Sequence, residues 1–97
     1  MKRTVRWTRR ASRRLERIGT RIEADNPAAA ARVVSAIARA VQRLDRAPGR
    51  GRPGRLRGTR ELVVVGTPYN IVAYRVHAND IEILTVQHGA QRWPDDL

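Results

Sequence analysis

Residues 55–94 read RLRGTRELVVVGTPYNIVAYRVHANDIEILTVQHGAQRWP and decide the fold of this chain. Three segments rich in β-branched residues follow one another here, and we expect strands from Glu61 to Thr67, Tyr69 to His77 and Ile81 to His88. The connections between them are too short for crossovers. The three strands are therefore predicted to be antiparallel.

A short strand and a helix are expected before this region. Val5 and Trp7 alternate with polar neighbours, as in a strand, and the Thr8 side chain is placed to cap a helix. Apolar residues then recur at intervals of four and three along one helical stripe: Ala11, Leu15, Ile18 and Ile22. Arginines repeat that spacing one residue earlier: Arg10, Arg14, Arg17 and Arg21. This helix is predicted to be amphipathic and basic.

Asn26 and Pro27 signal the start of a second helix, because asparagine caps free amides and proline suits the first helical position. Its apolar stripe is Ala30, Val34, Ile37, Val41 and Leu44. We expect it to end near Ala47, just before Pro48, where a loop extends to Arg55. Two helices with so short a connection form an antiparallel hairpin. Their apolar stripes predict that this hairpin packs on one face of a sheet.

The predicted order is β-α-α-β-β-β. This is an α+β fold in which the helix hairpin packs on one face of a small, mostly antiparallel four-stranded sheet. With 97 residues and a mass of 11.0 kDa, residues 1–97 are expected to form a single domain.

Composition excludes several kinds of site. There is no cysteine and there are only two histidines, so we expect neither a metal site nor a cofactor. Apolar runs are too short to span a membrane, and the basic N-terminus lacks the apolar core of a signal peptide. We therefore expect a cytoplasmic protein.

The charge is strongly uneven. The chain has 20 basic and 9 acidic residues, a net +11. Residues 1–58 hold 17 basic and 4 acidic residues, a net +13, whereas residues 59–97 hold 3 and 5, a net −2. Such a field favours a polyanion or an acidic protein segment as partner, although arginine is also a common solvated surface residue.

Several short sequence segments resemble those of a known protein family. They are WTRRASRRLERI (7–18), DNPAAAARVV (25–34), GTREL (58–62), AYRV (73–76) and the last strand ending in His88. Together they resemble the RelE/ParE superfamily of bacterial toxins. The resemblance implies a toxin of a type II toxin-antitoxin, or plasmid stabilization, module. An acidic antitoxin segment would wrap it in a higher-order complex. RelE-like toxins cut mRNA on the ribosome, whereas ParE-like toxins inhibit DNA gyrase.

RNA cleavage through the 2′-hydroxyl requires a proton acceptor, a proton donor and cations on the phosphate. Ile71 occupies the place of the arginine that RelE-like nucleases carry, counted back from Tyr74, and their middle-strand lysines are missing. The groups that remain for a nuclease are Arg60, Arg75, His88 and Arg92, with Glu61 beside them. We expect them to gather at one end of the open sheet face, provided that the tail after His88 turns back along the sheet.

Each of these residues also has a structural interpretation. Arg75 is as compatible with solvation as with function, and His88 shares phase with Leu84 and Val86, which favours packing at a strand end. Glu61 is placed to pair with Arg60. Trp93 is expected to anchor the tail by packing, and His77 is expected in solvent at a turn.

Two further groups of arginines are candidate binding residues. The loop set, with one aromatic residue, is assigned to the target or to nucleic acid: Arg50, Arg52, Arg55, Arg57 and Tyr69. The helix set is assigned to the antitoxin: Arg10, Arg14, Arg17 and Arg21.

Three functions follow. We favour a ParE-like gyrase inhibitor, because Ile71 replaces the nuclease arginine. The alternative is a RelE-like ribosome-dependent mRNA endoribonuclease. A non-catalytic nucleic-acid-binding module is the third, although two Trp and two Tyr offer little base stacking.

Overall fold

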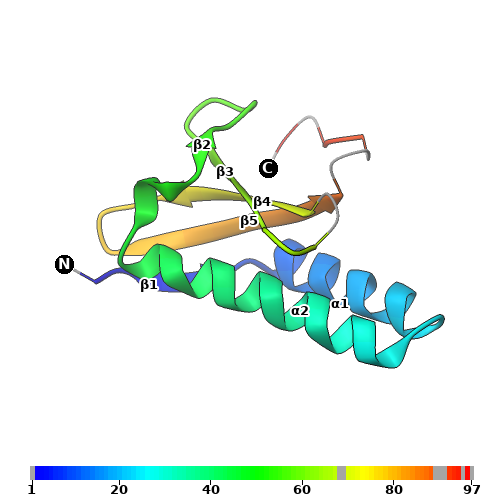
Figure 1. Ribbon diagram of the computed structural model, residues 1–97. Coiled ribbons are helices and arrows are strands. Elements are labelled where there is room, and N and C mark those ends of the chain that lie inside the picture. Colours follow the sequence, from blue (N-terminus) through cyan, green and yellow to red (C-terminus); the bar gives the residue numbers. More distant parts are fainter. Residues whose placement is uncertain (1, 68–69, 89–91, 95, 97) are drawn as a thin grey trace.

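A five-stranded sheet, in the order β1-β5-β4-β3-β2, carries a helix pair on one face (Figure 1). The computed structural model describes residues 2–67, 70–88, 92–94 and 96. The strands are β1 (Thr4–Trp7), β2 (Arg52–Pro53), β3 (Arg60–Val63), β4 (Asn70–Val76) and β5 (Asp80–His88). β1 is parallel to β5 and the other pairs are antiparallel. The predicted α+β class is confirmed, with one strand more than expected.

The extra strand is β2, which lies in the segment expected to be a loop. It pairs Arg52 with Glu61 and Pro53 with Arg60. A two-residue strand containing proline has no alternating pattern to detect, and proline gives no amide to the ladder. β3 and β4 are each shorter than predicted, and the expected start of β4 at Tyr69 lies outside the described residues.

Both helices begin where the caps predict. In α1 (Arg9–Glu23) the Thr8 side chain accepts from the Ala11 amide, and in α2 (Pro27–Gln42) the Asn26 side chain accepts from the Ala29 amide. The Thr8 hydroxyl also donates to the Ile83 carbonyl at 2.7 Å, so this cap fixes α1 to β5. Neither helix has the length and apolar character that a membrane crossing requires.

α2 ends at Gln42, earlier than expected near Ala47, and continues as a 3-10 turn, Arg43–Asp45. The tighter turn lets Leu44 enter the core with no exposed surface. The Asp45 carbonyl accepts from the Arg3 amide at 3.1 Å. If α2 continued as an α-helix for another turn, the Leu44 side chain would leave the core and the Asp45 carbonyl would lose its bond with the Arg3 amide.

The core lies between the helix stripes and the sheet. Its buried members include Ala11, Ile37, Val41, Leu62, Val72, Tyr74, Ile81, Ile83 and Val86. Burying each large apolar side chain contributes about 1.5–3 kcal/mol. This core confirms Ala11, Leu15 and Ile18 of the α1 stripe and Ile37, Val41 and Leu44 of the α2 stripe, whereas Ile22, Ala30 and Val34 are not part of the cluster. Val72 and Tyr74 give β4 its helix-facing side.

Tyr74 is fully buried and ties the loop after α2 to the sheet. Its hydroxyl donates to the Pro48 carbonyl at 2.7 Å and accepts from the Gly51 amide at 2.8 Å. A Cβ at position 51 would lie 2.6 Å from this hydroxyl oxygen. Glycine is required at this position because no side chain fits beside the tyrosine.

A bulge changes the phase of β5. Ala73 lies opposite Thr85 and Tyr74 lies opposite Ile83, so Leu84 is the extra residue. Ile83 and Val86 therefore both face the helices, while Thr85 lies on the opposite face with Ala73. The expected common phase of Leu84 and Val86 is wrong for this reason.

An arginine cleft as the candidate functional site

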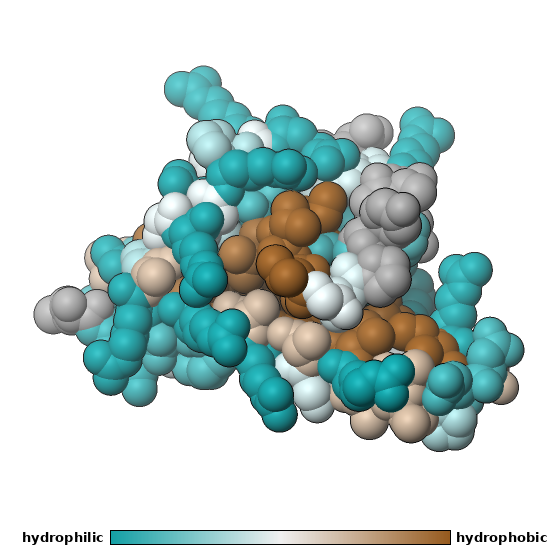
Figure 2. All heavy atoms as spheres, viewed as in Figure 1, coloured by the Kyte–Doolittle hydropathy of each residue, from teal (hydrophilic) through white to brown (hydrophobic). Residues whose placement is uncertain are grey.

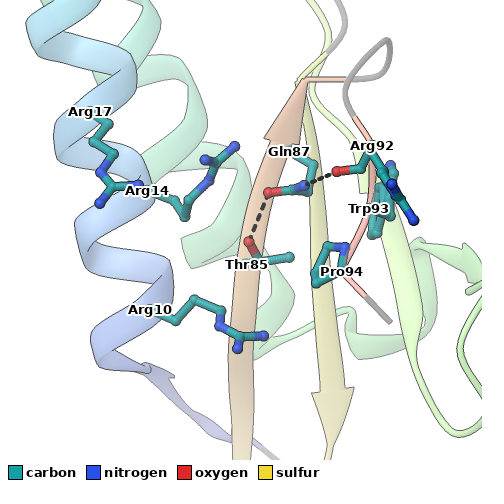
Figure 3. Close-up of a pocket in the computed structure, with 8 residues that line it drawn as sticks. All are labelled: Arg10, Arg14, Arg17, Thr85, Gln87, Arg92, Trp93 and Pro94. Atoms are coloured by element: carbon teal, nitrogen blue, oxygen red, sulfur yellow. Dashed lines mark hydrogen bonds between the residues drawn. The ribbon is translucent and has the colours of Figure 1, made fainter. Parts of the chain in front are cut away.

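The sheet face opposite the helices is crossed by the C-terminal tail. The Gln87 side-chain amide donates to the Arg92 carbonyl at 3.3 Å and accepts from the Thr85 hydroxyl at 3.1 Å (Figure 3). The Arg55 guanidinium carbon lies 3.8 Å from the centroid of the Trp93 ring. A cation over an indole face contributes about 0.5–1 kcal/mol at an exposed site. The expectation that Trp93 anchors a returning tail is confirmed.

A cleft of about 520 Å³ lies between this tail and α1, and we call it the arginine cleft. It is lined by Arg10, Arg14, Arg17, Thr85, Gln87, Arg92, Trp93 and Pro94 (Figure 3). Three of the arginines come from one face of α1, because they are spaced by four and three residues. Among the residues that the structure describes, four cations and no carboxylate line this cleft, so these side chains favour an anionic group there.

Two of these arginines also make contacts inside the chain. The Arg14 Nε donates to the Val86 carbonyl at 3.3 Å, beyond the part of β5 that pairs with β1. Arg10 donates to the Asp96 carbonyl at 2.9 Å. These bonds hold the cleft walls against β5 and the tail. Arg17 is exposed at the rim.

Glu61 is buried on this same face of the sheet, with 4% of its side chain exposed. It accepts from the Arg55 amide at 2.8 Å, from the Arg55 Nε at 3.1 Å and from Arg52 at 3.3 Å. Burial opposes its charge, but these donors outweigh burial and the pKa of Glu61 lies below its ordinary value. The expected pairing with Arg60 is wrong, because β2 brings Arg52 to that position instead.

The four residues expected to gather at one end of the open face are separated. Arg60 lies opposite Tyr74, in the helix-facing phase, and donates to the Gly49 carbonyl at 3.1 Å. His88 pairs with Asn70 at the other end of β4. The antiparallel register therefore places Arg60 and His88 at opposite ends of the sheet. Arg60 also lies on the helix-facing side and not on the open face.

Arg75 and Arg92 also lie apart. Arg75 is half-buried and pairs in register with Glu82, toward the end of the sheet away from His88. Arg92 lines the arginine cleft. The expectation of one cluster is corrected, because the tail returns beside Gln87 and does not carry Arg92 to the Arg75 end.

The other predicted binding arginines divide between several places. Arg52 and Arg55 bind Glu61, Arg50 lines a groove beside α2, and Arg57 is exposed. Arg21 is exposed in the last turn of α1. Tyr69 lies outside the described residues. Sequence reasoning missed Thr85 and Gln87 as the cleft floor, because the β5 bulge that sets their face leaves no residue pattern.

A separate ion cluster lies at the β1 end of the sheet. Arg6 bonds Asp80 at 2.9 Å and lies 3.6 Å from Glu82, and the hydrogen bond with Asp80 raises the pKa of Arg6. His77 Nε2 lies 3.0 Å from Glu82 Oε1. This contact lowers the pKa of Glu82, against a smaller effect of burial and with support from Arg6. His77, expected in solvent, is exposed but is held by this pair.

Residues 5–93 match the family described as "ParE toxin of type II toxin-antitoxin system, parDE". The chain belongs to this ParE toxin family. A protein of Sinorhizobium fredii described as "Putative toxin Y4kP" is 55% identical over 93 residues, covering 96% of this chain and 95% of that protein. The membership confirms the resemblance to the RelE/ParE superfamily.

Solved structures agree on the fold of this ParE-family toxin. A chain of the chromosomal ParDE system from P. aeruginosa is 28% identical with a TM-score of 0.81, covering 89% of this chain and 95% of that one. A chain of the toxin-antitoxin complex RelBE2 from Mycobacterium tuberculosis is 26% identical with a TM-score of 0.65, covering 91% and 99%. Both belong to toxin-antitoxin systems, which supports an antitoxin as the partner of this toxin.

Proposed function

We propose that this toxin arrests growth by binding DNA gyrase, without acid-base chemistry of its own. The observation that carries the proposal is the state of Glu61. Its carboxylate is buried under Arg52 and Arg55, and its pKa is lowered. A general base for RNA cleavage requires a pKa near the working pH and access to a 2′-hydroxyl. Glu61 meets neither requirement.

The positions of the other nuclease candidates support the same proposal. Arg60 is engaged by the Gly49 carbonyl on the helix side, and His88 lies at the opposite end of the sheet. Catalysis by positioned groups depends on convergence within hydrogen-bond reach of the reacting atoms. An inhibitor that acts only by binding needs a surface complementary to its target and no converging catalytic groups.

The surface for gyrase is the arginine cleft. Arg10, Arg14, Arg17 and Arg92 present cations beside the half-buried Trp93. Tryptophan and arginine are the residue types that contribute most at protein interfaces. The cleft is suited to an acidic segment of the target with an apolar neighbour.

The same arginine cleft is also the proposed site at which an antitoxin neutralises this toxin. Arg10, Arg14 and Arg17 belong to the helix set predicted to bind an acidic antitoxin. An acidic antitoxin segment in the cleft would exclude the target from it. Toxin activity and antitoxin binding would then compete for one set of cations.

Expression without antitoxin tests the proposal in cells. We expect filamentation with a DNA-damage response, because inhibited gyrase leaves DNA breaks and stalled replication. Arg17→Glu should relieve the arrest, whereas Arg32→Glu, an equal charge change at an exposed position of α2 outside the cleft, should not. Immediate loss of protein synthesis with cut transcripts would contradict the proposal.

A ribosome-dependent endoribonuclease is the second candidate, and one observation favours it. Four arginines and a tryptophan in one cleft also suit an RNA strand, through phosphate contacts and base stacking. This candidate predicts codon-linked mRNA cleavage that Arg92→Ala, a substitution inside the cleft, abolishes. Transcripts that stay intact during growth arrest would exclude this candidate.

A further inference from the structure

A row of arginines follows one exposed side of α2. Arg32, Arg39 and Arg43 are spaced by seven and four residues, close to two turns and one turn, so their side chains leave the helix on the same side. Arg46 ends the 3-10 turn that continues α2. Arg50 borders the same groove as Arg39 and Arg43, between α2 and residues 62–65. We call these five residues the α2 row.

The charge of the α2 row is not neutralised within the described chain. All five side chains are exposed, and none of them makes an ion pair or a hydrogen bond with another described residue. Asp45 is the single acidic residue between Pro27 and Arg60 in the sequence, and it is buried, 3.7 Å from the Lys2 Nζ. In Figure 2 hydrophilic side chains project along the front of the helix layer, where α2 lies in Figure 1.

The helix dipole explains only part of this charge. Cations in the last turn of a helix interact favourably with its carbonyl end, and Arg39 and Arg43 lie there. This effect is confined to the last turn. It does not extend to Arg32, in the first half of α2, or to Arg50, which lies beyond the helix. A row that continues past the helix end on both counts favours a ligand with repeated negative charges.

The structure also moves the available cations away from the loop. The sequence placed candidate nucleic-acid contacts in the loop set, but Arg52 and Arg55 bind the buried carboxylate of Glu61. Arg50 is the member of that set that joins the α2 row. The exposed charge in this half of the chain therefore lies mainly along α2.

The spacing of the α2 row suits a nucleic-acid duplex. Arg32 and Arg43 are about 17 Å apart along the helix axis, at about 1.5 Å per residue. Double-stranded DNA carries about one negative charge per 1.7 Å of its axis, so roughly ten phosphates lie along that length. The planar guanidinium group also bonds two phosphate oxygens at once. Several members of the row can therefore contact phosphates together.

The exposure of these arginines favours a polyanion over an acidic protein segment. An exposed ion pair with one protein carboxylate contributes roughly fivefold or less in affinity. On DNA each neutralised phosphate releases a condensed counterion, so exposed cations gain affinity there without being buried. Protein interfaces depend on aromatic and arginine side chains in desolvated pockets. No aromatic residue is among the described residues that line the groove beside the row.

We propose that the α2 row binds the phosphate backbone of double-stranded DNA without preference for sequence. Contacts to phosphates position a protein on DNA but do not read its bases. No member of the row lines the arginine cleft, so a toxin held on DNA would keep that cleft for its target. DNA binding would hold the toxin near the substrate of gyrase, while the cleft alone would make the inhibitory contact. The proposal does not depend on gyrase being the target.

The test is fluorescence anisotropy of a short labelled duplex of mixed sequence, titrated with purified toxin at several salt concentrations. The double variant Arg39→Gln/Arg43→Gln should lower the slope of log affinity against log salt by about two, roughly one for each lost phosphate contact. Its affinity at low salt should fall at least about tenfold.

The matched control is Arg9→Gln/Arg13→Gln. It removes two exposed arginines with the same four-residue spacing from α1, outside the arginine cleft. Its salt slope should change by less than about one. Both double variants should unfold at the wild-type temperature, because the substituted side chains are exposed. Arg39→Lys/Arg43→Lys should keep the wild-type slope, since the slope counts charges.

Three results would overturn the proposal. Equal losses in the two glutamine double variants would reduce DNA binding to the net charge of the protein. A glutamate oligomer that binds through Arg39 and Arg43 as tightly as DNA of equal charge would assign the row to an acidic protein segment. Tighter binding of duplex RNA than of duplex DNA through the same pair would assign the row to RNA. Failure to inhibit gyrase supercoiling would contradict the proposed function and leave the DNA result standing.

Discussion

Glu61→Gln probes the carboxylate that organises the open face. Glutamine keeps the shape of the side chain but removes the charge that Arg52 and three donors of Arg55 share. A hydrogen bond to a charged group contributes about 1.5–3 kcal/mol, and glutamine retains part of that set. We expect a loss of about 1.5–3 kcal/mol at pH 7, or roughly 6–24 °C in Tm for a domain of this size.

The loss should depend on pH in a defined direction. Because the pKa of Glu61 is lowered in the folded state, its charge stabilises the fold fully above the ordinary glutamate pKa. That contribution disappears as the pH falls through the lowered pKa, so wild type and variant should converge in acid. Thermal unfolding followed by circular dichroism from pH 7 down to pH 3 measures this convergence.

Glu23→Gln is the matched control, since Glu23 is exposed at the end of α1. It should change Tm little at any pH, as exposed charges contribute about 0–1 kcal/mol. If Glu61→Gln and Glu23→Gln unfolded at the same temperature at pH 7, the buried ion cluster would not stabilise the fold and the reasoning would fail.

Further predictions follow from the packing and the charge. Tyr74→Phe should cost about 1–3 kcal/mol in denaturant unfolding, because the Gly51 amide and the Pro48 carbonyl lose their partner; an unchanged midpoint would contradict this. Asn26→Ala should cost about 1 kcal/mol by removing the α2 cap, and equal unfolding of variant and wild type would refute it. In stopped-flow measurements, salt should slow antitoxin association far more than it speeds dissociation, and a salt-independent association rate would exclude charge steering.

Local signals predicted most of the fold. The Thr8 and Asn26 caps and the apolar stripes depend on residues close in sequence, and the helices begin at the expected positions. β2 and the Leu84 bulge depend on tertiary pairing, which leaves no periodic pattern. The phase of each strand downstream of such a bulge cannot be counted from sequence alone.

The candidate site was predicted less completely for the same reason. The stripe of Arg10, Arg14 and Arg17 was visible as helical spacing, and Trp93 as a tail anchor. The meeting of these two elements depends on where the chain turns after β5, a tertiary feature. The ion-pair partners of Glu61 also depend on β2. Glu61 therefore pairs with Arg52 and Arg55 and not, as predicted from the sequence, with Arg60.

Supercoiling of relaxed plasmid by purified gyrase, in the presence of the purified toxin, tests the central claim most directly. The account predicts that the toxin inhibits supercoiling, that Arg17→Glu weakens the inhibition, and that Glu61→Gln retains it at a temperature where the variant is folded. Undisturbed supercoiling, together with mRNA cut by the same preparation in a reconstituted translation reaction, would contradict it.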